Sequence, residues 1–155
     1  MSVIYNTGSL FDAPKGSIIT HACNAQGSWS KGIALEFKNR YPEAFKQYAH
    51  KCSKAYYALG WGENRSYLCG TAFIVDNIGC LVTSNMYGSA VDEPSLILSQ
   101  SRTAIRELLL LTDLEIHSNK FNSGLFRVPW EQTEAVIEEE LKAFGKDRKW
   151  TVWSP

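Results

Sequence analysis

The sequence predicts an α/β fold in which helices cover both faces of a mixed, mostly parallel sheet. Short β-branched or apolar runs alternate with longer amphipathic segments, and one pair of adjacent strand-like runs interrupts this alternation. The chain has 155 residues, 45% of them hydrophobic, which is enough for one ordinary core. No internal repeat or low-complexity stretch divides it. We therefore expect a single domain over residues 1–155.

Two strands open the chain. Ser2–Asn6 alternates in polarity and ends at Thr7-Gly8, so it is expected to be a short first strand. Ser17–Ala22 is β-branched and apolar enough for a central strand with both faces covered. His21, near the end of that run, is either a core histidine or a residue that orients a ligand or water.

Two helices follow. From Gly32 the apolar residues adopt a helical period, and Pro42 begins a second helical segment that continues to about Cys52. Tyr56–Asn64 is rich in glycine and aromatic residues and is expected to be a surface loop. The predicted buried stripe consists of Ile33, Ala34, Phe37, Tyr41, Phe45, Tyr48 and Ala49.

The second half of the sequence predicts a hairpin, two more helices and two more strands. The hairpin turn is expected at residues 77–79, and Asn85–Glu93 and Ser118–Val128 are expected to be polar loops. The expected strands are Thr71–Asp76, Gly79–Ser84, Asp113–His117 and Trp150–Trp153. The expected helices are Ser95–Leu111, which Pro94 begins, and Glu131–Phe144, which Gly145 ends.

The stretch His21–Phe37 has the character of a binding site. It joins a strand to a helix through a polar loop with glycines, and the free N–H groups at a helix start suit a phosphate. Ser118–Val128 is a second polar loop after a strand. Since ligands of α/β sheets bind beyond the carboxyl ends of strands, we expect both loops to meet at one crevice.

Charge and cysteine content narrow the class of partner. Sixteen basic and sixteen acidic residues cancel, and no basic run suits duplex DNA or an anionic membrane. We therefore expect neither nucleic acid nor membrane as a partner. The four cysteines form no C-x-x-C pair, and no leader or apolar run of membrane-spanning length is apparent. These features predict an intracellular protein, cytoplasmic, nuclear or both, with reduced thiols.

Several kinds of catalytic site have no support in the motifs. The three histidines are scattered and no Cys/His spacing suits zinc, so neither metal nor cofactor is expected. There is no G-x-S-x-G turn and no Walker phosphate loop. A nicotinamide-dependent oxidoreductase is disfavoured by the missing G-x-G-x-x-G after the first strand. What remains is a site of Asn, Gly, Ser and backbone N–H, which suits a diphosphate and ribose hydroxyls.

Four segments together resemble the macro domain family, and within it the small yeast-type ADP-ribose 1″-phosphate phosphatases. The segments are Gly8-Ser9-Leu10, HACNAQGSWSKGIALEF, LVTSNMYG with the following Val91-Asp92-Glu93-Pro94, and FNSGLFRVPW. The resemblance covers nearly the whole chain. It implies a three-layer α/β/α sandwich, an ADP-ribose derivative as ligand, and a substrate that arises from by-products of tRNA splicing. We expect a monomer.

The resemblance also implies which residues surround ADP-ribose. The adenosine end lies near Gly8–Leu10, although Ser9 replaces the Asp that many macro domains use for the adenine amino group. Asn24 matches the asparagine at the distal ribose, and residues 122–128 match the second diphosphate loop. The full expected set is Gly8, Ser9, Leu10, Ala22, Cys23, Asn24, Trp29, Ser30, Lys31, Gly32, Ile33, Ala34, Asn122, Ser123, Gly124, Leu125, Phe126, Arg127 and Val128.

Departures from the family pattern bear on the chemistry. Lys31 stands where relatives have a small residue, and it either contacts a terminal phosphate or points to solvent. Arg127 poses the same alternative. Relatives that release ADP-ribose from acidic side chains use a Lys near the position of Ser84 and an Asp near Phe126. This chain has neither, so that lysine-adduct chemistry is disfavoured.

Water attack on the 1″-phosphate monoester is the mechanism that the remaining residues favour. Asn24 would position the distal ribose or the water, and His21 is the first candidate for an acid/base or orienting role. Asp92 is a second candidate, unless its carboxylate caps the following helix. Two other functions stay open: a binding module for ADP-ribose without turnover, and a hydrolase that removes ADP-ribose from modified proteins.

Overall fold

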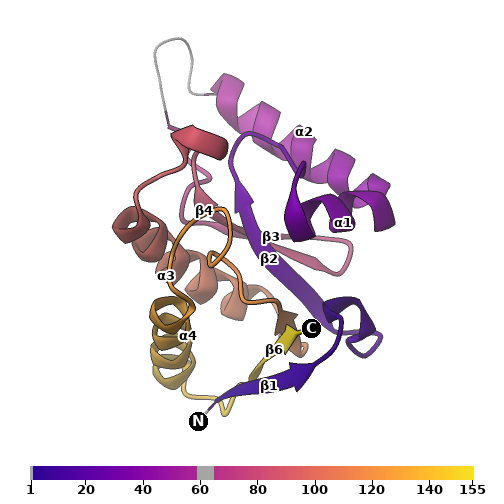
Figure 1. The fold of residues 1–155 in the computed structure, drawn as a ribbon, viewed down its shortest axis with the longest axis vertical. Helices are drawn as coiled ribbons and strands as arrows, with labels where there is room; N and C mark the ends of the chain where they lie inside the picture. The colour runs from indigo at the N-terminus through magenta and orange to yellow at the C-terminus, as the bar shows by residue number, and fades with distance from the viewer. Residues whose placement is uncertain (1, 59–64) are drawn as a thin grey trace.

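A computed structural model describes residues 2–58 and 65–155, which form one six-stranded sheet with helices on both faces (Figure 1). The strands are β1 (Val3–Thr7), β2 (Ile18–Asn24), β3 (Ala72–Val75), β4 (Ile78–Ser84), β5 (Ile116–Ser118) and β6 (Trp150–Ser154). The α-helices are α1 (Gly32–Arg40), α2 (Pro42–Ala58), α3 (Pro94–Leu111) and α4 (Trp130–Phe144). Two short 3₁₀ helices are η1 (Leu10–Asp12) and η2 (Gly88–Ala90).

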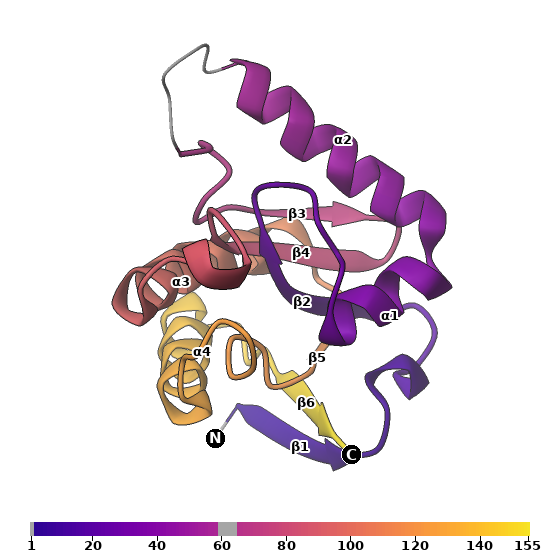
Figure 2. The same ribbon diagram turned by 45° about the horizontal axis from the view of Figure 1, so that its top comes forward.

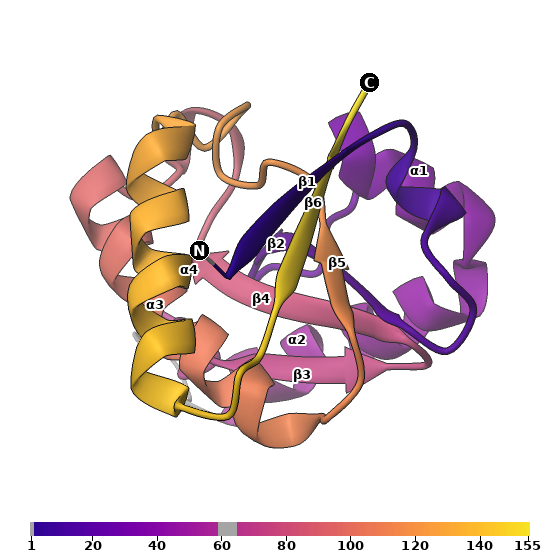
Figure 3. The same cartoon turned by 90° about the horizontal axis from the view of Figure 1, so that it is seen from below.

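The sheet is mixed and mostly parallel, as predicted. Its strand order is β1-β6-β5-β2-β4-β3, and only the β3–β4 pair is antiparallel. Figure 3 shows β2, β4 and β5 near the middle of the sheet and β1 beside β6. The first and last strands are thus neighbours, although they lie at opposite ends of the chain.

Two apolar clusters, one on each face of the sheet, confirm the three-layer α/β/α sandwich. On one face, Phe37 of α1 and Tyr48 of α2 pack against β2 and the Cys80 side of β4. On the other face, α3 and α4 cover Leu81, which is the next residue of β4 (Figure 2). Since successive strand residues point to opposite faces, a strand buried on both sides must be apolar throughout. All seven residues of β4 are accordingly buried.

Several element boundaries differ from the sequence prediction by one residue, and three differ by more. The predicted loop at 56–64 is wrong at its start, because α2 continues to Ala58; residues 59–64 lie outside the described residues. β2 extends two residues further, to Asn24, because its ladder with β4 continues past Ala22 with a register shift between Cys23 and Asn24. β5 begins at Ile116 rather than Asp113, since residues 113–115 are polar or exposed.

The hairpin and the helix ends follow local sequence signals. The turn between β3 and β4 is Asp76-Asn77, one residue earlier than predicted, and Asp76 has a left-handed φ of 54°. Gly145 ends α4 with a φ of 77°, a conformation that favours glycine. Within the described part of the chain, no helix combines the length and apolar character needed to cross a membrane.

Candidate functional site

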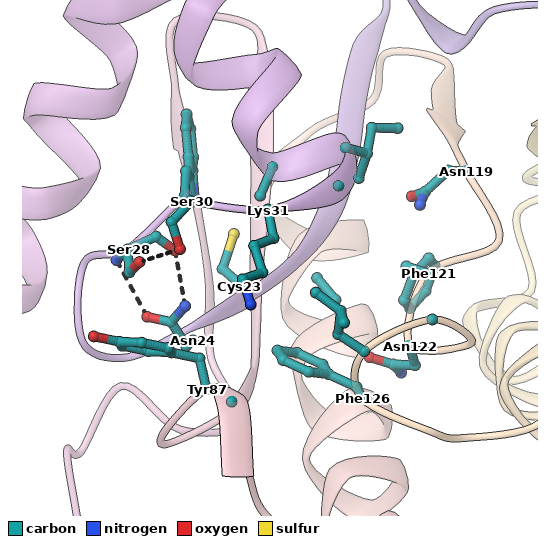
Figure 4. Close-up of a pocket in the computed structure, with 18 of the residues that line it drawn as sticks. Cys23, Asn24, Ser28, Ser30, Lys31, Tyr87, Asn119, Phe121, Asn122 and Phe126 are labelled. Carbon is teal, nitrogen blue, oxygen red and sulfur yellow. Dashed lines mark hydrogen bonds between the residues drawn. The ribbon is translucent and has the colours of Figure 1, made fainter. Parts of the chain in front are cut away.

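A cavity of about 560 Å³ opens at the sheet edge where β2, β4 and β5 end (Figure 4). Because β4 and β5 run parallel to β2, the carboxyl ends of three neighbouring strands meet there. We call residues 22–34 the first wall, residues 119–127 the second wall and residues 85–92, of which 87 and 88 line the cavity, the third wall. The lining residues are Ala22, Cys23, Asn24, Ser28, Trp29, Ser30, Lys31, Gly32, Ile33, Ala34, Tyr87, Gly88, Asn119, Lys120, Phe121, Asn122, Gly124, Leu125, Phe126 and Arg127.

Asn24 anchors the first wall. Its Oδ1 accepts hydrogen bonds from the N–H groups of Gln26 (2.9 Å) and Ser28 (3.3 Å), and its Nδ2 donates to the Ser28 carbonyl (2.8 Å). From α2, the Tyr48 hydroxyl donates to the Asn24 main-chain oxygen at 2.6 Å. One N–H of the Asn24 amide has no protein partner among the described residues and remains for a ligand.

The start of α1 faces the cavity with free hydrogen-bond donors. Lys31 occupies the N-cap position without a side-chain cap, so the first N–H groups of the helix have no side-chain acceptor there. The loop before it packs closely on α2: a side chain at Gly27, whose φ is 82°, would lie 3.3 Å from the Cα of Ala49. In Figure 4 the Lys31 side chain runs into the space between Asn24 and Phe126.

Asn122 anchors the second wall through residues distant in the sequence. Its Oδ1 accepts from the Thr83 hydroxyl of β4 at 2.9 Å, and its Nδ2 donates to the Ser101 hydroxyl of α3 at 2.8 Å. Its φ of 68° is left-handed, as is that of Arg127 at 63°. Such conformations cost about 1 kcal/mol or more for residues other than glycine and tend to persist at functional sites.

The third wall carries Tyr87 and is held by Asp92. The Asp92 carboxylate accepts two hydrogen bonds from Arg65 (2.9 and 2.8 Å) and one from the N–H of Asn85 (2.9 Å). The amide of Gln100 donates to it at 3.1 Å. The hydrogen bond from Arg65 is the main reason that the Asp92 pKa is lowered to about 2.

The cavity is positively charged. Lys31, Lys120 and Arg127 line it, whereas no Asp, Glu or His does among the residues that the structure describes. None of these three cations forms an ion pair with a residue in 2–58 or 65–155. The same residues contain no group of three or more His, Cys, Asp or Glu that could hold a metal ion. The arrangement suits a polyanionic organic ligand.

The macro domain family model matches residues 20–137, which is most of the chain. The chain belongs to the macro domain family. A protein of Chaetomium globosum named ADP-ribose 1″-phosphate phosphatase is 37% identical over 148 residues, covering 85% of this chain and 80% of that protein. One of the same name from Lodderomyces elongisporus is 35% identical over 162 residues, covering 90% and 92%. The resemblance that the motifs indicated is thereby confirmed.

Solved structures support the fold of this macro domain. The macrodomain of Mycobacterium tuberculosis DarG superposes with a TM-score of 0.77 at 20% identity, covering 99% of this chain and 97% of that one. The macrodomain of Thermus aquaticus DarG gives a TM-score of 0.76 at 19% identity, covering 99% and 98%. At such identity the likeness concerns the fold alone.

Most predicted ligand residues of the macro domain line the cavity, but five do not. Gly8, Ser9 and Leu10 lie outside it: Ser9 caps η1 by accepting from the Phe11 N–H, and Leu10 is 3% exposed in the core. Val128 is fully buried behind the second wall, and the Ser123 hydroxyl donates to the Lys120 carbonyl. The cavity is thus formed by the two loops without Gly8–Leu10, and the placement of the adenosine end near Gly8–Leu10 stays a prediction.

His21 is a core residue and does not line the cavity. The prediction that it acts directly as an acid or base on a ligand there is therefore wrong. It is 0% exposed, and its ring stacks on Phe37 at 4.1 Å between centroids. Its Nε2 lies 3.6 Å from the sulfur of Cys23, which does line the cavity. Burial opposes ionisation of that thiol, but contacts with Cys80 and His21 outweigh it and lower the Cys23 pKa to about 5.

Asp92 is likewise corrected as a catalytic candidate. It does not line the cavity, and four hydrogen bonds occupy its carboxylate. The alternative that it caps α3 is also wrong, because the N-cap residue is Glu93 and no side chain caps that helix. Its position makes it a support of the third wall.

Six lining residues were not predicted. Ser28 lies inside the first wall, and Asn119, Lys120 and Phe121 begin the second. Tyr87 and Gly88 come from the loop after β4. Ligands of α/β sheets bind beyond the carboxyl ends of parallel strands, and this rule applied to Gly79–Ser84 would have found Tyr87 and Gly88. The rule requires that β4 runs parallel to β2, and the local sequence does not reveal the strand direction.

Proposed function

We propose that this macro domain hydrolyses ADP-ribose 1″-phosphate to ADP-ribose and phosphate. The observation that carries the proposal is a cavity whose described lining holds three cations without an ion-pair partner in residues 2–58 or 65–155, and no carboxylate, beside a helix start without a side-chain cap. ADP-ribose brings a diphosphate, and its 1″-phosphate brings a third phosphate group. A pocket with this excess of positive charge suits the more anionic of the two ligands. The names of the relatives from Chaetomium globosum and Lodderomyces elongisporus point to the same substrate.

The chemistry left to such a pocket is electrostatic. Water attacks phosphorus and the P–O bond to the ribose breaks. One proton of the water passes to the departing ribose oxygen, and the phosphate keeps the oxygen that the water supplied. Oriented N–H groups and Lys31 stabilise the charge on the phosphoryl oxygens. These donors are already in position before the reaction begins. The free N–H of Asn24 is placed to hold a ribose hydroxyl or the attacking water. In this proposal the buried His21 does not contact the ligand.

Phosphate release tests the proposal. The purified protein is incubated with ADP-ribose 1″-phosphate, and phosphate is measured against a Gly124→Glu variant, whose new carboxylate should exclude the substrate. We expect release by the wild type that is lost in the variant. Tight ADP-ribose binding without release above background would overturn the phosphatase proposal.

A binding module without turnover is the second candidate, because the described lining contains no carboxylate or imidazole to act as a base. The same assay separates the two functions, since a module binds ADP-ribose and leaves the phosphate in place. Incubation with an ADP-ribosylated protein adds a separate arm for de-ADP-ribosylation. Without a Lys at position 84 or an Asp at position 126, we expect no release there.

A further inference from the structure

Cys23 differs in position from the other three cysteines of the chain, all of which lie in its described part. Cys52 and Cys80 are buried away from the cavity, and Cys69, which is partly exposed, lies outside it. Cys23 is 2% exposed, but it lines the cavity, and Figure 4 shows its side chain among those around the opening. Cys23 is therefore the cysteine that a small reagent inside the cavity can reach.

The His21 ring holds the Cys23 sulfur. Its Nε2 lies 3.6 Å from the Cys23 Sγ. The ring is fixed in place, because it stacks on Phe37 at 4.1 Å between centroids and contacts the Trp29 ring edge-on at 4.8 Å. Its Nδ1 is buried and has no hydrogen-bond partner among the described residues. Since the available hydrogen bonds set the tautomer of a neutral histidine, the form with its proton on Nε2, facing the sulfur, is favoured.

The groups around the sulfur favour its ionised form. Burial raises the pKa of Cys80 on β4 and of Tyr48 on α2, and it raises the pKa of Cys52 on α2 to about 12, so these three groups stay neutral. Burial opposes ionisation of Cys23 as well, but contacts with Cys80 and His21 outweigh it and lower the Cys23 pKa to about 5. A thiolate beside a histidine is the reactive form of cysteine.

We propose that Cys23 is an oxidation site at which a hydroperoxide converts the thiolate held by His21 to a sulfenic acid, and that the added oxygen narrows the cavity. His21 is a positioning residue, because its Nε2 faces the sulfur while the ring stays in the core. Hydrogen peroxide is small enough to enter a cavity of about 560 Å³ and meet the sulfur there. The oxidation goes beyond the proposed function, since it requires no ADP-ribose derivative.

The oxidation needs no reactant besides the peroxide and solvent. The sulfur attacks one peroxide oxygen, the O–O bond breaks, and the other oxygen leaves as hydroxide and takes a proton from solvent. Sulfur loses two electrons, and the peroxide gains them. In the sheet Cys23 pairs with Val82, whereas Cys80 pairs with His21. Such diagonal neighbours normally lie farther apart than a disulfide allows, so the sulfenic acid is the expected product.

The first test uses ordinary exposure as the competing explanation. The reduced wild-type protein, without any ligand, is oxidised briefly with hydrogen peroxide at pH 7 and then unfolded in dimedone, which traps sulfenic acids. Peptide mass spectrometry quantifies the label on each cysteine. We expect Cys23 to be labelled at least ~10-fold faster than Cys69, which is more exposed but has a pKa raised by burial. Faster labelling of Cys69, or no labelling of Cys23, would overturn the proposal.

Two matched variants test the role of His21. His21→Phe keeps an aromatic ring in the core and removes the imidazole. His117→Phe makes the same change on β5, where the imidazole bonds to Glu115 and Trp153. We expect Cys23 oxidation to slow by roughly tenfold or more in His21→Phe and to match the wild type in His117→Phe. Equal losses in both variants, or no loss in His21→Phe, would overturn the role of His21.

The pH profile of the wild type gives the same information if His21→Phe does not fold. Iodoacetamide should alkylate Cys23 at a nearly constant rate between pH 8 and pH 6, because the Cys23 pKa is about 5. At Cys69, whose pKa is raised, the rate should fall about tenfold per pH unit over the same range. A Cys23 profile that parallels that of Cys69 would show an ordinary thiol and overturn the proposal.

The narrowing of the cavity is tested with a ligand, and this measurement alone rests on the proposed function. Calorimetry gives the ADP-ribose affinity before oxidation, after oxidation and after reduction with dithiothreitol. We expect a loss of roughly threefold or more that reduction reverses, and no effect of peroxide in Cys23→Ala. Unchanged affinity in the oxidised wild type would overturn the narrowing. If no ADP-ribose binds before oxidation, the proposed function fails, while the labelling experiments still decide whether Cys23 is an oxidation site.

Discussion

The first and second walls of the pocket are each anchored by a buried asparagine, but the two asparagines bond over different distances in the sequence. The Asn24 side chain makes three bonds within its own loop, to residues two and four positions later, and accepts one more distant bond, from the Tyr48 hydroxyl of α2 at 3.1 Å. Asn122 bonds to Thr83 and Ser101, which are 39 and 21 residues away on β4 and α3. The first wall is therefore organised locally, whereas the second depends on the packed sheet and helix behind it.

This difference predicts how far the effect of a mutation in each wall extends through the fold. Loss of the Asn24 side chain should disorganise the first wall and its ligand contacts with a modest effect on the rest of the fold. Loss of the Asn122 side chain removes bonds to two other elements, leaves the buried Thr83 hydroxyl without its acceptor and should destabilise the whole domain. Four predictions break or sharpen this contrast: two on ligand binding and turnover come first and two on stability follow, each pair from the larger effect to the smaller.

Gly124→Glu should give the largest effect, and it acts on the second wall without touching its anchor. Gly124 has no left-handed φ, and a Cβ there would meet nothing within 4 Å, so the fold should accept the change. A carboxylate beside the phosphates of the ligand should lower ADP-ribose affinity by at least ~100-fold. Calorimetry measures this. Gly124→Gln, similar in size but neutral, should lose far less; equal losses would show that bulk rather than charge is responsible.

Asn24→Ala should mainly affect function. It removes the acceptor for two loop N–H groups and the free N–H at the cavity. We expect turnover to fall by ~10- to 100-fold and the free energy of unfolding by about 1–3 kcal/mol. Enzyme assays and urea unfolding check the two numbers. A variant with full activity would show that the local network does not position the ligand.

Asn122→Ala should mainly affect stability. The buried Thr83 hydroxyl loses its acceptor, and the Ser101 hydroxyl loses a donor but still bonds to the Ile97 carbonyl. Alanine must also adopt a φ of 68°, so we expect a loss of ~2–4 kcal/mol. Asn122→Gly is the matched control, since it loses the same bonds and relieves the left-handed strain. It should be more stable than the alanine variant by about 1 kcal/mol. If both variants unfold like the wild type in urea, the contrast between the two walls is wrong.

Asp92 gives the smallest effect and concerns the third wall. Because its pKa is lowered in the folded state from 3.8 to about 2, its contribution is fully present above the ordinary pKa and is lost as pH falls through the folded value. We expect ~1–2 kcal/mol, after allowance for the exposure of Arg65. Asp92→Asn should be less stable than the wild type by this amount at pH 7 and nearly equal at pH 2. A difference independent of pH would exclude the carboxylate charge as its source.

The sequence predicted the features that depend on local chemistry. The helical period after Gly32, the proline at position 42 and the apolar run of the central strand identified elements that the structure contains. The polar loop around Asn24 stood out because asparagine, serine and glycine favour turns that bond to their own backbone. The motifs in the two loops also carried the family resemblance, which the comparisons confirmed.

The two errors in the catalytic candidates share one physical cause. His21 and Asp92 were candidates because their side chains can transfer protons, but packing decides whether such a group meets a ligand. The ring of Phe37 from α1 stacks on His21, and Arg65 forms hydrogen bonds with the Asp92 carboxylate. Neither partner is close in the sequence, so no local pattern could exclude these roles.

By itself, the sequence determined the α/β class, the order of the elements, the family and two of the three pocket walls, because these follow from periodicity and from short-range turn chemistry. Only the tertiary structure decided that β4 runs parallel to β2 and brings Tyr87 to the cavity. It also decided that Gly8–Leu10 do not line the cavity and that three cations gather there with no carboxylate in the described lining. Strand direction and the distance between charges depend on residues that are far apart in the sequence and close in space, so local sequence patterns do not determine them.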